Sequence, residues 1–425
     1  MIKDQSEISH RNQSEQCLSS LIIKNTEIPE IPIQNKKNET IIFQYSIYKG
    51  RPATIFFEYP SVCNQKRDKA RTFEIKEKQI IQKYDLKYST GSVLKPFYCV
   101  TQCFENAGFR KCQQELNDWN GHWAGKMRNT KKMNKFQKTN HFPGCWNLGR
   151  KDLLWMRQSK MKRQFPKEYN FLPTTYLLKC EWEAFVNKIN KKKNKQIWIW
   201  KPVASACGRG IQRNIDVNKI FSQIHDIIIK TCIAVEPFML NSINKQPEHR
   251  NNCFELYGFD VLVDKNLKVW LLEVNVCPSL SSTSPLDKII KTSLICDILH
   301  IVGFQGYYKK QYKKQQQQYS KINQNINVVE ENKILFSRDI KCISELNYDN
   351  CFDLLSDQDW EVMFQTDEEF YRKGQNFKRI FPPENTKKIR YYSQFFQFKR
   401  YYNEIIWNMY NSEQNYLEKI YKKND

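Results

Sequence analysis

The chain has 425 residues, of which 40% are hydrophobic, so it can bury cores in about two or three domains and is not a disordered protein. Its 68 Lys and Arg residues outnumber the 45 Asp and Glu residues, and the net charge of +23 favours an anionic partner. No apolar run approaches the length that a bilayer-spanning helix needs, so we expect no membrane segment.

The positive charge alone does not identify that partner. Nucleic acid is the generic expectation, but the sequence contains no zinc finger, aromatic RNA-binding signature or basic zipper, and its lysines are spread over several segments. We therefore expect no specific nucleic acid as partner. An acidic protein surface attracts such a chain equally well.

The cysteines raise the question of disulfides or zinc, because the chain contains 14 of them. No Cys-x-x-Cys pair occurs, which argues against both. The first residues, up to Ser20, are polar and lack the pattern of a signal peptide. We therefore expect reduced thiols in a cytoplasmic protein.

The N-terminal part of the sequence divides into a polar tail and an apolar region. Residues 1–40 are rich in Asn, Gln, Ser and Glu without apolar periodicity, so we expect a disordered tail. The lysine-rich run Lys126–Lys138 is either a solvated basic loop or part of a rim that faces an anion. We expect an α/β subdomain at residues 41–139, with strands or apolar segments at Thr40–Phe43, Thr54–Phe57, Val93–Val100 and Trp119–Trp123.

A helix is predicted at Glu181–Ile189, because its apolar residues recur at helical spacing. This pattern is more typical of a packed core than of a recognition surface. The apolar residues are Trp182, Phe185, Val186 and Ile189.

The loop after the short strand Trp198–Trp200 predicts a phosphate site. Lys201 ends the strand, and the small residues and two glycines that follow let backbone N–H groups contact phosphate oxygens while the ammonium neutralises them. The loop is neither a Walker A motif nor a Gly-x-Gly-x-x-Gly fingerprint. The candidate ligands are Lys201, Cys207, Gly208, Arg209 and Gly210.

The segment Phe259–Asn275 has the pattern of a strand, a tight turn and a second strand. If the turn sets the register, Asp260 and Glu273 come near each other, and Asn275 faces the same side as Glu273. Oxygen donors of this kind suit Mg²⁺, which completes its shell with water and substrate phosphates. The segment therefore predicts a nucleotide site, and the alternative is a surface hairpin whose acidic side chains are only solvated.

A helix then begins at Ser284–Asp287, with a proline in its first turn. Lys291 in this helix, considered by itself, has the features of an exposed helix lysine. The residues expected on the apolar face of the helix are Ile289, Ile290, Leu294, Ile295 and Ile298.

The remaining sequence consists of a linker and a basic, aromatic region. Residues 304–334 are rich in Gln, Lys and Asn and are predicted to form a low-complexity linker. Within residues 335–425, Cys351–Phe370 and Tyr391–Tyr421 are helical in pattern. Aromatic and basic residues on one helix can cover a protein surface, stack on nucleic acid or pack onto the rest of the protein.

Several of these motifs together resemble the tubulin tyrosine ligase-like family, in its polyglutamylase branch. The resemblance covers roughly residues 41–303 and 335–410, and agreement over separate blocks is more specific than any one motif. The core motifs are Lys201-Pro-x-Ala-Ser-x-x-Gly-x-Gly-Ile, Glu255-Leu-x-Gly258-Phe-Asp260 and Leu272-Glu273-Val-Asn275-x-x-Pro278-Ser279-Leu280. Further blocks begin at Asp118, Asn140, Gly149 and Asp367.

The resemblance implies an α/β (α+β) fold with an ATP-grasp-like core at residues 140–303, an N-terminal α/β subdomain and a C-terminal helical extension. It implies ATP bound by the phosphate loop and Mg²⁺ held by Asp260, Glu273 and Asn275, with Lys291 contacting a substrate glutamate. No catalytic side chain is assigned beyond these ligands. The implied reaction adds free glutamate to the acidic C-terminal tails of tubulin. We accordingly expect a monomer in the cytoplasm and cytoskeleton, including the cilium or basal body.

The chain departs from the family pattern between the phosphate loop and the hairpin. The family carries there an adenine-contacting hinge, a Lys-Phe-Asp-Leu-Arg strand and a Leu-Thr-Asn-Tyr-Ser turn, whereas here Ile211–Arg213 passes almost directly into the helical segment Val217–Ile229. Cys207 also stands where the family commonly has arginine. Two hypotheses follow, an active ligase whose sequence omits a coding block and a catalytically inactive relative that binds microtubules.

Overall fold

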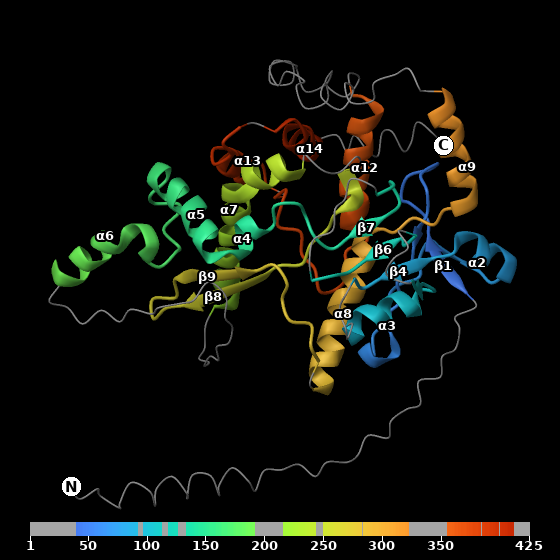
Figure 1. Ribbon diagram of the computed structural model, residues 1–425, viewed down its shortest axis with the longest axis horizontal. Helices are drawn as coiled ribbons and strands as arrows, with labels where there is room; N and C mark the ends of the chain where they lie inside the picture. The colour runs from blue at the N-terminus through green and yellow to red at the C-terminus, as the bar shows by residue number, and fades with distance from the viewer. Residues whose placement is uncertain are drawn as a thin grey trace, which may run out of the picture. The chain divides into compact units, whose positions relative to one another are not determined.

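The computed structural model combines helices with three small sheets in the part of the chain that it describes (Figure 1). That part comprises residues 40–91, 97–112, 118–125, 133–191, 216–243, 250–282, 284–322, 355–383, 385–398 and 400–411. The expected polar tail up to residue 39 and the expected strand Trp198–Trp200 lie outside it. The described residues pack as one unit. None of their helices is long and apolar enough to cross a membrane.

Two sheets form in the N-terminal part of the described chain. The antiparallel sheet places β1 (Ile41–Gln44) between β2 (Thr54–Ile55) and β3 (Thr72–Ile75), which confirms the strands expected near Thr40 and Thr54. All strand pairs of the second sheet are parallel, so the carboxyl ends of its strands lie at one edge. Its order is β5 (Arg110–Lys111), β4 (Lys87–Ser89), β6 (Gly121–His122) and β7 (Lys138–Thr139).

A first buried cluster joins these sheets to two helices, α3 (Tyr98–Asn106) and α8 (Pro285–Val302). The apolar run expected at Val93–Val100 ends inside α3. Phe104 of α3 stacks on Tyr88 of β4, with 5.0 Å between the ring centres. The Cys103 thiol of the same helix donates to the Thr292 carbonyl of α8 at 3.4 Å. Helix α3 is therefore enclosed between the parallel sheet and α8.

Helix α8 begins where the sequence predicts, because the Ser284 hydroxyl accepts the Asp287 N–H at 3.1 Å and Pro285 occupies the first turn. Ile295 and Ile298 of the expected apolar face are buried. Ile290, however, is 56% exposed, so its assignment to that face is wrong. The reason is that the buried part of the helix begins only at Thr292.

A second buried cluster lies under a two-stranded sheet of β8 (Gly258–Val263) and β9 (Val269–Asn275). Helix α7 (Val217–Ile243) starts at the residue expected from the sequence and packs on β9. Val269, Leu271 and Val274 of β9 and Ile227 and Ile233 of α7 are all buried in this cluster. One face of the strand pair is thus part of a core.

Helix α6 (Leu178–Lys191) confirms the helix expected at residues 181–189, but its apolar residues do not form a core. Trp182 is 57% exposed, and no residue of α6 belongs to a buried cluster of the described chain. The prediction of a packed face was therefore wrong for Trp182, because helical spacing specifies a common face without specifying what covers it.

The C-terminal part of the described chain forms α12 (Asp357–Tyr371), α13 (Thr386–Ser393) and α14 (Tyr401–Asn411). A continuous helix from Tyr391 was expected, but α13 ends at Ser393 and α14 begins only at Tyr401. Tyr392 and Phe395 are buried in the second cluster, so packing is the correct alternative for these rings, whereas Phe398 is 58% exposed.

The remaining elements of the described chain are helices and 3₁₀ turns that pack around the buried clusters, and one helix in the expected linker. Residues 309–322, predicted as part of a low-complexity linker, form helix α9 (Lys309–Ile322). The other helices are α2 (Lys78–Tyr84), α4 (Trp146–Gly149), α5 (Lys151–Gln164) and two 3₁₀ turns at Ser61–Cys63 and Arg250–Asn252.

Asp297, in the middle of α8, connects the two ends of the described chain. Its fully buried carboxylate accepts hydrogen bonds from the Tyr59 hydroxyl and the Arg67 guanidinium, both at 2.6 Å, and from the Asn376 amide at 2.6 Å. A buried carboxylate needs such partners, because burial without them is strongly unfavourable. Gly374 passes so close to this carboxylate that any Cβ there would overlap it.

We expect Asp297→Asn to lower the free energy of unfolding by about 3 kcal/mol, because the buried Arg67 charge would lose its counter-ion. Urea denaturation followed by circular dichroism measures the change. Glu183→Gln makes the same substitution of carboxylate by amide at an exposed position of α6 and should leave the midpoint unchanged. Equal midpoints for Asp297→Asn and the parent protein would contradict the importance of this carboxylate.

Candidate functional site

The strand pair β8–β9 has the register that the sequence predicts. Asp260 pairs with Glu273, and Gly258 pairs with Asn275, before a bulge shifts the register after Asp260. Because alternate residues of a strand share a face, Asp260, Glu273 and Asn275 lie on one face of the pair. The opposite face, with Val274, is buried in the second cluster. The expected register and shared face are confirmed, while the convergence of the three side chains on one ion and their role as metal ligands stay predictions.

The turn of this hairpin is stabilised by Asp264, whose Oδ1 accepts the backbone N–H groups of Asn266 and Lys268 at 2.8 and 3.1 Å. Its second carboxylate oxygen accepts the indole N–H of Trp270 at 2.9 Å. Leu267 has a left-handed conformation with a φ of 59°. Asp264 therefore stabilises the turn, and we do not count it with Asp260 and Glu273 as a candidate metal ligand.

The two carboxylates of the site have different surroundings. Asp260 is exposed, whereas Glu273 is only 8% exposed and forms an ion pair with the Lys151 ammonium at 2.9 Å. Lys151 is the first residue of α5, so the start of that helix is placed against the hairpin. Lys151 belongs to a block of the family resemblance, but its sequence position gave no indication that it contacts Glu273.

Lys291 reaches back from α8 toward the segment that follows β9. Its ammonium donates to the Ser281 carbonyl and lies 3.5 Å from the Asp287 carboxylate in the preceding turn. The side chain is thus held near the end of the hairpin and does not simply extend into solvent. The candidate phosphate ligands Lys201, Cys207, Gly208, Arg209 and Gly210 lie outside the described residues.

A second polar centre surrounds His141, just after β7. Its residues His141 and Glu255 lie within the family motifs, but the motifs gave no indication of their role. The Nδ1 atom of His141 lies 2.7 Å from Oε1 of Glu255, and its Nε2 lies 2.6 Å from the Ala124 carbonyl. Burial by itself lowers the pKa of His141, but hydrogen bonds to two thiols and to Glu255 outweigh this effect and raise the pKa to about 12. The imidazole joins the end of β7 to the segment before β8.

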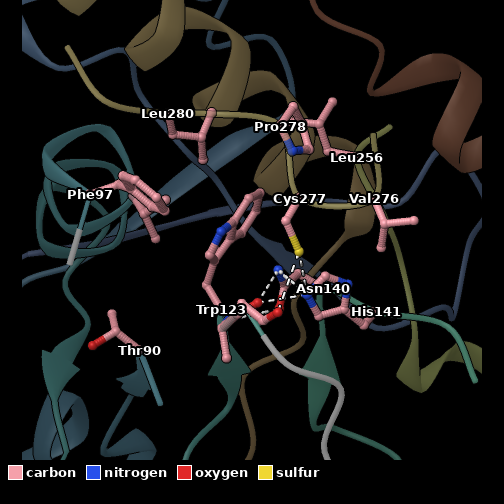
Figure 2. A pocket seen from close by; sticks show the side chains of 13 residues that line it. Thr90, Phe97, Trp123, Asn140, His141, Leu256, Val276, Cys277, Pro278 and Leu280 are labelled. Atoms are coloured by element: carbon pink, nitrogen blue, oxygen red, sulfur yellow. Dashed lines mark hydrogen bonds between the residues drawn. The ribbon is translucent and has the colours of Figure 1, made fainter. Parts of the chain in front are cut away.

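A cavity of about 150 Å³ lies beside this centre (Figure 2). It is lined by residues that directly follow strands of the parallel sheet, Thr90 after β4, Trp123 after β6 and Asn140 after β7. Cys277 and Leu280, which follow β9, close another side. Parallel sheets commonly bind ligands at the carboxyl ends of their strands. The cavity was not expected from the sequence, since its walls come from segments far apart in the chain.

The sequence of the chain is similar to those of known proteins. The model of the "Tubulin-tyrosine ligase family" matches residues 128–214 and 212–314. The tubulin monoglutamylase TTLL4 of Mus musculus is 25% identical over 486 aligned positions, covering 83% of this chain and 40% of the relative. The human tubulin polyglutamylase TTLL5 is 27% identical over 46% of the chain and 24% of its own length, and human TTLL6 is 25% identical over 52% and 37%.

These matches also bear on the block that is missing between the phosphate loop and the hairpin. The two matched segments of the family model meet at residues 212–214, where the sequence departs from the family pattern. The alignment with the mouse relative is longer than the whole chain, so that relative carries residues that this chain lacks. The chain spans 40% of the length of that relative.

We expect Glu273→Gln to abolish magnesium-dependent nucleotide binding, because a neutral amide cannot replace an anionic ligand in a site with two carboxylates. Isothermal titration calorimetry with ATP, with and without Mg²⁺, measures the loss. Glu183→Gln on α6 is the matched control and should bind as the parent does. Equal magnesium-dependent binding by Glu273→Gln and the parent would remove Glu273 from the metal site.

Proposed function

Because the chain matches the model of the tubulin-tyrosine ligase family and is similar to tubulin glutamylases, we propose that it is an ATP-dependent ligase that joins glutamate to glutamate side chains of tubulin C-terminal tails. The observation that best supports this proposal is the common face of Asp260, Glu273 and Asn275 on the hairpin. Two lysines from other elements, Lys151 and Lys291, are placed around that face. We further propose an ATP-grasp-like core, with the chain acting as a monomer in the cytoplasm and cytoskeleton, including cilia.

The donor set of the hairpin suits Mg²⁺, since it offers two carboxylates and an amide oxygen on neighbouring strands. Asp260, Glu273 and Asn275 would hold the ion, which supplies charge neutralisation for the phosphates of ATP when it is bound. Lys201 and the loop to Gly210 would contact the phosphate oxygens. The Lys151 ammonium forms an ion pair with Glu273. When a metal binds, Lys151 must share this carboxylate with the ion or move away from it.

The reaction requires little acid or base chemistry from the protein. A side-chain carboxylate of the tubulin tail attacks the γ-phosphorus of ATP, ADP leaves, and an acyl phosphate forms. The amino group of free glutamate then attacks the acyl carbon, phosphate leaves, the nitrogen loses a proton and an isopeptide bond results. The protein's part is to position these groups and to stabilise the charge that develops on the transferred phosphoryl group. Lys291, held at the end of the hairpin, is suited to contact a carboxylate of the incoming glutamate.

A second candidate function is microtubule binding without catalysis. It is favoured by the block missing near residues 212–214, which in the family lies between the phosphate loop and the hairpin. The transcript across codons 211–217 distinguishes the two cases. A message that carries the block in frame supports the ligase, and a continuous message supports the inactive relative.

The structure offers a basic groove for an acidic partner. A cavity of about 680 Å³ between α7, the β8–β9 turn and the start of α13 is lined by six cationic side chains, of which Lys230 is paired with Glu168 and Asp226 in the same lining. Burial and the charges of two of these lysines lower the pKa of His225, which also lines the groove. The six cationic residues are Lys167, Lys230, Lys268, Lys378, Arg379 and Lys388.

The C-terminal helices are not a detachable binding segment. The Arg400 guanidinium pairs with Glu236 of α7 at 2.7 Å, and the Tyr392 hydroxyl donates to Asp226 at 2.9 Å. Arg51 pairs with Glu368 of α12 at 2.8 Å. Deleting this region would therefore remove packing as well as charge, so substitutions in the basic groove are the sharper test of partner binding.

We expect the purified chain to incorporate labelled glutamate into tubulin in the presence of Mg-ATP, if the block near residue 212 is dispensable for catalysis. Lys201→Ala should reduce this activity by weakening ATP, and added Mg²⁺ should not restore it, because the lysine contacts phosphate directly. Lys78→Ala in the distant helix α2 is the control. Microtubule binding without any incorporation by the parent chain, together with a continuous message across codons 211–217, would instead identify the inactive relative.

We expect the double variant Lys378→Glu and Lys388→Glu to sediment less with microtubules than the parent, and the parent itself to bind less as salt rises, because exposed charges are screened beyond about 10 Å at 0.1 M ionic strength. Lys78→Glu with Lys83→Glu makes the same charge change on α2 and should retain binding. Removal of the acidic tubulin tails by protease should weaken binding by the parent. Tight RNA or DNA binding at physiological salt, with no effect of tail removal, would assign a nucleic-acid role instead.

A further inference from the structure

Three metal-ligating side chains come together behind the cavity of Figure 2, outside the face that bears Asp260 and Glu273. His141, Cys145 and Glu255 each offer one ligand atom, and these atoms all lie within 4.8 Å of one another. His141 and Cys145 are buried, and the side chain of Glu255 is fully buried. We call these three residues the His141 cluster. The proposed ligase reaction uses none of them.

The hydrogen bonds around His141 determine what must lie at the centre of the cluster. Nε2 lies 2.6 Å from the Ala124 carbonyl, which can only accept, so Nε2 carries a proton. In a neutral imidazole Nδ1 is then an acceptor, yet it faces the Oε1 atom of Glu255, another acceptor, at 2.7 Å. Two lone pairs at this distance repel each other unless a cation lies between them or beside both. That cation is either a proton between the two atoms or a metal ion beside both.

The other hydrogen bonds of Glu255 involve only Oε2, so Oε1 is available to contact the cation. Its Oε2 atom accepts the backbone N–H of Phe142 at 3.0 Å and the hydroxyl of Tyr257 at 2.7 Å. The carboxylate is therefore oriented by groups that need not move. A ligating histidine commonly donates its second ring N–H to a carbonyl, as His141 does to Ala124, and a ligating carboxylate is commonly held by further hydrogen bonds.

We propose that the His141 cluster binds a divalent ion of the zinc class through Nδ1 of His141, Sγ of Cys145 and Oε1 of Glu255. The donors are one nitrogen, one sulfur and one oxygen, a set that suits Zn²⁺ and does not suit Mg²⁺ or Ca²⁺. Binding displaces the proton on Nδ1 and the thiol proton of Cys145. A water molecule completes the coordination, since Oε2 of Glu255 already accepts two hydrogen bonds. Because the ligands are buried, the ion has a structural role.

Gly144 explains how the sulfur reaches the imidazole. Its φ of 81° is in the left-handed region, and a Cβ at this position would lie 2.8 Å from the Ser242 hydroxyl. The tight turn at Pro143–Gly144 returns the chain so that Cys145, at the start of α4, faces His141. Spacing of cysteines in the sequence cannot indicate such a site, because it has one cysteine and its carboxylate comes from the segment before β8.

Metal content tests the proposal directly. The full chain, purified without a histidine tag, should contain about one equivalent of Zn²⁺ by inductively coupled plasma mass spectrometry. Removal of zinc with a chelator should lower the melting temperature, and added Zn²⁺ should restore it. Co²⁺ added to the metal-free protein should produce thiolate-to-cobalt absorption in the near ultraviolet. Substoichiometric zinc in the purified protein together with no cobalt absorption would overturn the proposal and leave a proton between His141 and Glu255.

Two thiol variants assign the ion to this cluster. Cys145→Ser should lose the cobalt absorption and most of the zinc. Cys277→Ser is the matched control, because its sulfur lies 3.7 Å from Nε2, the opposite nitrogen of the same ring, and should keep both. Unchanged cobalt absorption in Cys145→Ser would overturn the assignment. If that variant does not fold, Glu255→Gln provides the second test, with loss of zinc at retained thiol content expected and full zinc content contradicting the proposal.

Discussion

The pairing of the buried Asp297 carboxylate is the constraint on which the arrangement of the described chain depends. Its partners come from the N-terminal part, through Tyr59 and Arg67, and from the C-terminal part, through Asn376. A carboxylate buried without partners would cost several kcal/mol, so the buried position of α8 depends on the segments that supply these partners. The close approach of Gly374 shows how tightly the C-terminal segment is fitted to this helix.

The position of α8 in turn affects the candidate site. The helix is fixed at its buried end by Asp297, and its first turns extend beyond the core, where Lys291 contacts the segment that follows β9. The hairpin itself is fixed from the other side, since Val269, Leu271 and Val274 are buried with α7. The face that bears Asp260 and Glu273 is therefore presented by a core-packed strand pair, which favours a defined geometry for its ligands.

The described chain has two polar centres, one on the β8–β9 hairpin and one around His141. Asp260 is exposed, and Glu273, although only 8% exposed, lies on the same face of the hairpin, opposite the buried cluster. His141 and Glu255 are buried behind the cavity and join the end of β7 to the segment before β8. A buried, hydrogen-bonded histidine–carboxylate pair of this kind contributes to specifying one arrangement of the strands, and the same geometry makes it a candidate metal site.

The sequence by itself determined the local features whose signals are short in range. The hairpin register followed from a turn between two apolar strands, and the start of α8 followed from Ser284 and Pro285, since caps and turns depend on neighbouring residues. The resemblance to the family followed from several separate motifs along the chain. Only the tertiary structure decided that Lys151 pairs with Glu273, that Trp182 and Ile290 are exposed, and that Cys145 meets His141 and Glu255. Periodicity tells which residues share a face, but burial and long-range pairing depend on what the rest of the chain places against that face.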